Sequence, residues 1–74
     1  MKTYVTLTLS SEGGKASEVT EILQNLGFEA VHGNYDFVYD WKTKKVPVEE
    51  LIAFADKVQS ALRGKNVLFQ IISV

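Results

Sequence analysis

Three features of this sequence predict an α+β domain in which two helices cover one face of a four-stranded antiparallel sheet. Segments near both ends of the 74-residue chain are rich in apolar and β-branched residues, as strands are. Two longer segments repeat apolar residues at helical spacing. A Gly-Asn pair between them joins two short strand-like stretches, so the predicted order is strand, helix, strand, strand, helix, strand.

The first strand is predicted over Lys2–Leu9, where valine and leucine alternate with tyrosine and threonine. Residues 10–14 are serine and glycine-rich and break the pattern. They include Gly14-Lys15, but neither phosphate-loop spacing is present, so we interpret this stretch as a strand-to-helix connection. A helix is predicted over 15–26, and Gly27 follows at the position where glycine commonly ends a helix. Its apolar stripe consists of Ala16, Val19, Ile22, Leu23 and Leu26.

The pair Gly33-Asn34 predicts a two-residue hairpin turn of type II′, because glycine takes the positive φ that its first position requires. That turn fixes the register as Val31 with Asp36, Ala30 with Phe37, and Glu29 with Val38. Directly paired residues share a face of a sheet. One face then carries Phe28, Ala30, His32, Tyr35, Phe37, Tyr39 and Trp41, and the other carries Glu29, Val31, Asp36, Val38 and Asp40.

The second helix is predicted to begin at Pro47, which the first helical turn accepts, and to end near Arg63 before Gly64. Its predicted buried stripe is Val48, Leu51, Ile52, Ala55, Val58 and Leu62, with Phe54 toward the flank. The last strand is predicted over Asn66–Val74. Its side chains alternate between two faces, with Val67, Phe69 and Ile71 on one and Leu68, Gln70 and Ile72 on the other.

This order of elements predicts a single ferredoxin-like domain over residues 1–74, with the first and third strands in the centre of the sheet. The face away from the helices is predicted to mix apolar and polar side chains, which favours contact with a second copy. Its members are Tyr4, Thr6, Thr8, Glu29, Val31, Asp36, Val38, Asp40, Leu68, Gln70 and Ile72. So small a domain buries a limited core, and self-association would add stability.

Composition narrows the classes of function. The net charge is −1, which disfavours direct nucleic-acid binding, and the chain has no cysteine for a disulfide or a thiolate metal site. No apolar run approaches the roughly 20 residues of a membrane span, so we expect a cytoplasmic protein. Asp36 and Asp40 on the open face argue against stacking of RNA bases there.

The segment His32–Val38 resembles the G-x-Y-D segment of two families, the ligand-sensing domain of Lrp/AsnC-type regulators and the small GYD-domain proteins. Gly33, Tyr35 and Asp36 match this motif. The resemblance implies a ligand-binding site at these three residues, near a dimer contact, for a small metabolite such as an amino acid. No helix-turn-helix precedes the sheet, and the step Gly64–Val67 into the last strand is longer than in the regulators.

We therefore expect a small-molecule-binding or protein-interaction module that self-associates, without catalysis, cofactor or metal. Two alternatives remain open: a small dimeric α+β barrel enzyme that uses His32 and Asp36, or a structural adaptor of unknown partner. Histidine and a carboxylate are a suitable pair for proton transfer. The predicted register, however, points these two side chains to opposite faces, and the chain has no second histidine for a metal site.

Overall fold

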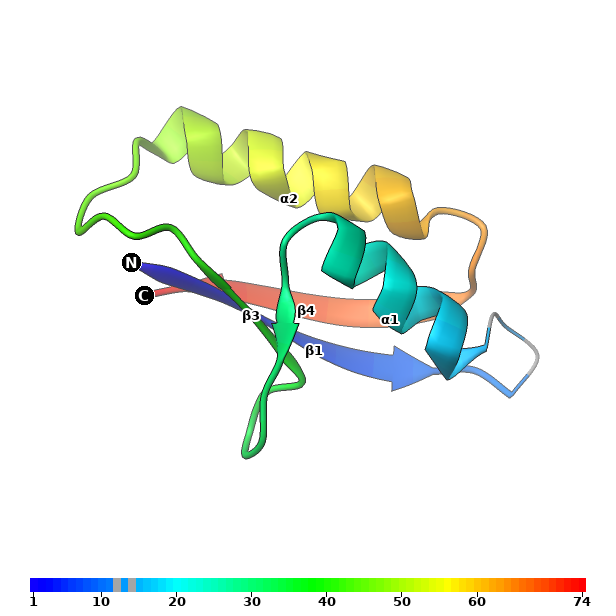
Figure 1. Cartoon of the computed structure of the whole chain (residues 1–74). Coiled ribbons are helices and arrows are strands. Elements are labelled where there is room, and N and C mark those ends of the chain that lie inside the picture. The colour runs from blue at the N-terminus through cyan, green and yellow to red at the C-terminus, as the bar shows by residue number, and fades with distance from the viewer. Residues whose placement is uncertain (12, 14) are drawn as a thin grey trace.

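The computed structural model describes residues 1–11, 13 and 15–74. It contains β1 (Lys2–Leu9), α1 (Ala16–Asn25), β2 (Glu29–Ala30), β3 (Phe37–Asp40), α2 (Val48–Leu62) and β4 (Val67–Ser73), in the predicted order. The strands form one antiparallel sheet, β2-β3-β1-β4, and both helices pack on one side of it (Figure 1). The predicted ferredoxin-like fold is confirmed. The strand-to-helix connection predicted over 10–14 includes residues 12 and 14, which lie outside the described residues.

The central position of β1 is also confirmed, with β3 on one side of it and β4 on the other. Val5 lies opposite Phe37 of β3 and opposite Ile71 of β4. Because side chains alternate along a strand, the buried Thr3 and Val5 point toward the helices, and Tyr4 and Thr6 point to the other face.

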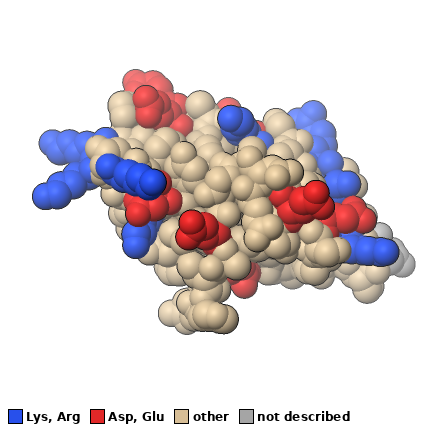
Figure 2. All heavy atoms as spheres, viewed as in Figure 1, with Lys and Arg blue, Asp and Glu red and all other residues tan. Residues whose placement is uncertain are grey.

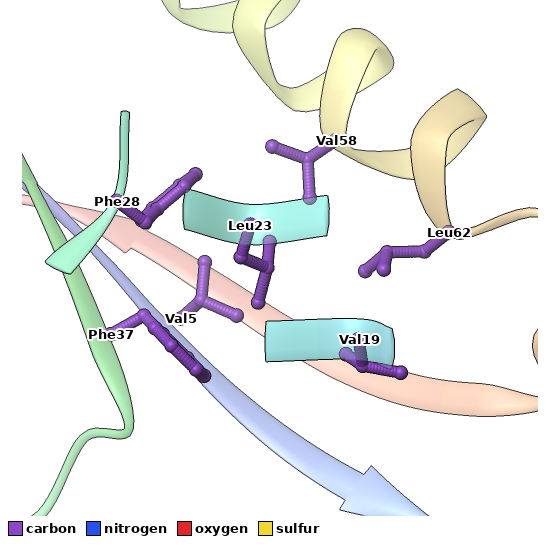
Figure 3. Packing of buried hydrophobic residues seen from close by; sticks show 7 residues of the cluster. All are labelled: Val5, Val19, Leu23, Phe28, Phe37, Val58 and Leu62. Carbon is purple, nitrogen blue, oxygen red and sulfur yellow. The ribbon is translucent and has the colours of Figure 1, made fainter. Parts of the chain in front are cut away.

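The core lies between the helices and the sheet (Figure 3). Leu23 of α1 and Val58 of α2 meet Val5 of β1 at its centre. Its buried members are Val5, Val19, Leu23, Phe28, Phe37, Val58 and Leu62. Each large apolar side chain contributes roughly 1.5–3 kcal/mol on full burial, so this cluster is the main source of stability.

The C-terminus of α1 is closed by Gly27, as predicted. Gly27 has φ +102°, and its N–H donates to the carbonyl oxygen of Gln24 at 3.0 Å. The N–H of Phe28 donates to the carbonyl oxygen of Leu23, also at 3.0 Å. These two bonds form a Schellman motif, and they turn Phe28 back into the core against Leu23.

Helix α2 differs from the prediction in which face it buries. Val48 is 65% exposed and Ile52 is 57% exposed, whereas Phe54 packs against the core. At about 100° per residue, Ile52 lies about 120° around the helix from the buried Val58, but Phe54 lies only about 40° from it. The prediction was therefore wrong for Val48, Ile52 and Phe54. Pro47 lies one residue before the helix and its carbonyl accepts the first helical hydrogen bonds.

An aromatic cluster closes one end of the core, and Phe54 belongs to it. Its rings lie 4.6–5.8 Å apart between centroids and come from Phe28, Tyr39, Trp41 and Phe54. The indole N–H of Trp41 donates to the hydroxyl of buried Thr3 at 2.8 Å, and that hydroxyl also lies 2.7 Å from the hydroxyl of Ser73. These bonds satisfy the polar groups that burial would otherwise leave unpaired.

No helix in the described part of the chain is long and apolar enough to cross a bilayer.

Candidate functional site

The hairpin between β2 and β3 keeps the register predicted from its turn residues. Glu29 lies opposite Val38 and Ala30 lies opposite Phe37. The N–H of Val31 donates to the carbonyl oxygen of Asp36 at 3.0 Å, which continues the pairing by one step. Gly33 has the positive φ of the predicted turn, +109°. The ladder is short, since β2 spans only two residues.

Asp36 forms a bulge where β3 meets β1. Phe37 is the register partner of Val5, yet the N–H of Asp36 also donates to the carbonyl oxygen of Val5, at 3.0 Å. Asp36 and Phe37 thus both oppose Val5 of β1, as in a β-bulge at the start of β3. The Asp36 carboxylate then accepts a hydrogen bond from the N–H of Leu7 at 2.8 Å. At this position a side-chain oxygen therefore replaces the backbone carbonyl that would accept the next hydrogen bond of the ladder.

The bulge changes the faces to which the predicted site residues point. The ring of Tyr35 stacks on that of Tyr4, with centroids 4.5 Å apart and planes 26° apart, so Tyr35 lies on the open face. Asp36 instead lines a groove with Leu7 and Phe37, which point toward the helices. The prediction placed each of these two residues on the opposite face. It was wrong because one extra residue in a strand inverts the alternation beyond it.

The structure therefore does not bring Gly33, Tyr35 and Asp36 together as one site. Gly33 is at the exposed tip of the hairpin, where a Cβ would meet no atom within 4 Å. This tip projects from the body of the protein and carries no charged side chain (Figure 2). Tyr35 lies on the open face, and Asp36 lies in the groove beside α1. Of these three residues, Asp36 alone lines a hollow in the described part of the surface.

The groove at Asp36 has a volume of about 280 Å³. Among the described residues, four apolar side chains line it together with the Asp36 carboxylate and the Thr20 hydroxyl. The lining residues are Leu7, Leu9, Ala16, Thr20, Asp36 and Phe37. One carboxylate oxygen of Asp36 is bonded to Leu7, and the exposed carboxyl group can accept a further hydrogen bond from a cationic ligand. An apolar cleft with few polar groups is typical of small-molecule sites.

His32 and Asp36 are not arranged as a catalytic pair in the structure. His32 is exposed on the hairpin, and Asp36 is bonded to the backbone of β1. The part of the chain that the structure describes holds no group of three or more His, Cys, Asp or Glu placed to bind a metal ion.

The second surface of interest is the open face of the sheet, on the side away from both helices. Leu68 is 74% exposed there and Ile72 is 46% exposed, and Tyr4 and Val38 are half-buried beside them. The register aligns Tyr4 with both Val38 and Ile72, so these side chains adjoin across three strands. The centre of this face carries no charged residue. It is made by Tyr4, Thr6, Thr8, Val38, Leu68, Gln70 and Ile72.

Sequence reasoning identified most of this open face correctly, because the alternation in β1 and β4 is unbroken. The groove at Asp36 was missed, because a bulge has no clear signature in the sequence.

Comparison with known proteins adds no relative: no family model, curated protein or solved structure matches this chain. The functional argument therefore depends on these two surfaces.

Proposed function

We propose that the protein is a non-catalytic binding module that self-associates through the open face of its sheet. The main support is that this face is uncharged at its centre and exposes the apolar side chains of Leu68 and Ile72. An antiparallel sheet that meets water on one side usually alternates apolar residues inside with polar residues outside. In β4 the outward positions are apolar at Leu68 and Ile72, which favours a covered face.

A second copy of the chain suits this face for two reasons. First, the charged side chains of this face, Lys2, Glu29 and Asp40, are exposed at its margin beside Tyr4 and Val38, where they can stay in water when two such faces meet. Second, its four large apolar side chains, Tyr4, Val38, Leu68 and Ile72, would be buried on both copies. At roughly 1 kcal/mol each for partial burial, these eight side chains contribute about 8 kcal/mol, which exceeds the lower end of the cost of association, about 4–15 kcal/mol, by about 4 kcal/mol. We therefore expect a dimer that dissociates on dilution.

Thr6→Lys is the sharpest test of this proposal. Thr6 lies in the middle of the face on β1, between Tyr4 and Thr8 and opposite Gln70. Lysine there places like charges within the contact, and we expect the dissociation constant to rise at least about tenfold, equivalent to 1.4 kcal/mol. Light scattering over a concentration series should then give a lower average mass than the unmodified protein at each concentration where the unmodified protein is partly dimeric.

Ser60→Lys is the matched control, since Ser60 is exposed on α2, about 200° around the helix from the buried Val58. This variant adds the same charge on the opposite side of the molecule and should leave the mass curve unchanged. If Thr6→Lys gave the same curve as Ser60→Lys, the open face would not be the contact surface.

The groove at Asp36 favours a second candidate function, the binding of a small metabolite with an ammonium group, such as an amino acid. A carboxylate at the rim of an apolar cleft can accept a charge-assisted hydrogen bond from an ammonium group, while Leu7, Leu9 and Phe37 contact an aliphatic side chain. The resemblance of the hairpin segment to ligand-sensing domains supports the same ligand class.

Asp36→Asn separates ligand binding from the structural role of this residue. The amide oxygen of asparagine can still accept the hydrogen bond from Leu7, but the negative charge is lost. In a thermal-shift screen of the aliphatic amino acids, a ligand at 100 times its dissociation constant should stabilise the unmodified protein by about 2.7 kcal/mol. We expect Asp36→Asn to melt near the unmodified protein and to lose this response. An equal response in both proteins would exclude Asp36 as the ligand-binding group.

A further inference from the structure

Strand β4 forms one edge of the sheet, and it has none of the features that usually protect an edge. It lies at the end of the strand order, next to β1 alone. Its sequence, VLFQIIS, spans seven residues without a proline, a glycine or a charge. Natural sheets commonly protect edge strands with lysine, proline, bulges or short length. The opposite edge follows that rule, since β2 has only two residues.

The hydrogen bonds to β1 determine which backbone groups of β4 point outward. Lys2 and Val74 exchange both of their backbone bonds, at 2.8 and 2.9 Å. Such pairs alternate along an antiparallel ladder, so Ile72, Gln70 and Leu68 also bond to β1. The N–H and C=O groups that point away from the sheet therefore belong to the remaining four positions, Val67, Phe69, Ile71 and Ser73.

We propose that β4 pairs antiparallel with β4 of a second copy, with Gln70 on the twofold axis. This register places Phe69 opposite Ile71 and Val67 opposite Ser73, so all four outward positions of each strand find a partner. Moving the axis to Phe69 or to Ile71 would leave one outward position of each copy unpaired. Because an unpaired backbone group is costly once it is removed from water, the register centred on Gln70 is favoured.

The side chains of β4 are self-complementary in this same register. On the open face, Leu68 of one copy lies opposite Ile72 of the other, and these two are exposed in the single chain. Gln70 lies opposite its own copy at the axis, where the two side-chain amides can donate to and accept from each other. No like charges meet anywhere along the contact, since β4 has none.

This contact is distinct from the face-to-face contact proposed above, and neither requires the other. Pairing at the edge joins two four-stranded sheets into a continuous sheet of eight strands. The twofold axis is perpendicular to that sheet, so the helices of both copies lie on the same side. The open faces of the two copies then form one larger surface.

Single-cysteine crosslinking tests the edge contact directly, because the natural chain contains no cysteine. In Gln70→Cys the two thiols would lie across the axis at a non-hydrogen-bonded pair, where Cα atoms are about 4.5 Å apart, within the range of a disulfide. Under mild oxidation we expect a covalent dimer at least about tenfold faster than for Ser60→Cys, which measures random collision on exposed α2. Equal rates for the two variants would overturn the proposal.

Two further readouts keep this test independent of the open face. Combining Gln70→Cys with Thr6→Lys should preserve the crosslink, because Thr6 lies one strand inside the edge. In the natural chain, amide exchange at Phe69 and Ile71 should slow as protein concentration rises, since their N–H groups would become bonded. If exchange at these two amides did not depend on protein concentration, the edge contact would be overturned. It would also be overturned if β4 paired only with a strand of a different protein.

Discussion

Leu23→Ala is expected to lower the free energy of unfolding by about 2–5 kcal/mol. Leu23 is fully buried at the middle of the core, where it lies between Val5 of the sheet and Val58 of α2 (Figure 3). Alanine would remove contacts with both layers and leave a cavity that a small core cannot fill. A chain of this length has a total stability of about 4–11 kcal/mol, so the variant should be close to unfolding at room temperature.

Urea unfolding followed by tryptophan fluorescence would measure this loss, because the single Trp41 packs in the aromatic cluster. Val48→Ala is the matched control. It also removes an aliphatic side chain from a helix, but Val48 is mostly exposed on α2, and we expect a change within about 0.5 kcal/mol. A large loss at Val48 with a small loss at Leu23 would contradict the packing of both helices.

Gly27→Ala is expected to destabilise the protein by about 2–4 kcal/mol, which combines two costs. The first is the left-handed backbone, φ +102°, which costs a residue with a Cβ about 1–2 kcal/mol. The second is steric, because that Cβ would lie 2.8 Å from Cε1 of Tyr39. The Tyr39 ring is held between Phe54 and Trp41, with centroids 4.6 and 5.1 Å away, so it has little room to move.

Gly64→Ala separates the two costs. Gly64 also has a positive φ, +82°, but a Cβ there would meet no atom within 4 Å. We expect a loss of about 1–2 kcal/mol from the backbone alone, or a fall in melting temperature of about 4–16 °C. Thermal unfolding of the two variants should show the larger shift for Gly27→Ala. Equal shifts would mean that the Tyr39 ring does not restrict this position.

The parts of the fold that were predicted correctly are those set by local chemistry. Gly33-Asn34 determines the hairpin register through the backbone angles that a two-residue turn needs. Gly27 ends α1 because glycine adopts a left-handed conformation at little cost. The alternation in β1 and β4 assigns the two faces of the central sheet. Once the order of elements is known, right-handed crossovers leave few arrangements for them.

The features that were missed depend on contacts between distant segments. At the bulge, the Asp36 carboxylate accepts a hydrogen bond from the N–H of Leu7, 29 residues away in the sequence. Periodicity alone did not show that α2 turns Phe54 inward and Ile52 outward. That rotation lets Phe54 join rings from β3 and from the segment after α1. The buried hydroxyl of Thr3 similarly finds its partners, Trp41 and Ser73, far along the chain.

The bulge also changes what the candidate site can do. If β3 had continued without it, Asp36 would point to the open face, in the middle of the proposed contact with a second copy. The bulge instead moves the carboxylate to the groove beside α1 and brings the Tyr35 ring onto Tyr4. The open face is thereby left without a charge at its centre, and the groove gains a charged group. One extra residue thus separates the two proposed binding surfaces.

Self-association makes the solution mass of the unmodified protein depend on its concentration. Light scattering over a dilution series should give at least twice the chain mass of 8.3 kDa at high concentration, falling toward 8.3 kDa on dilution. A mass of 8.3 kDa at every concentration up to about 1 mM, where even a contact of −4.1 kcal/mol would be half formed, would contradict it.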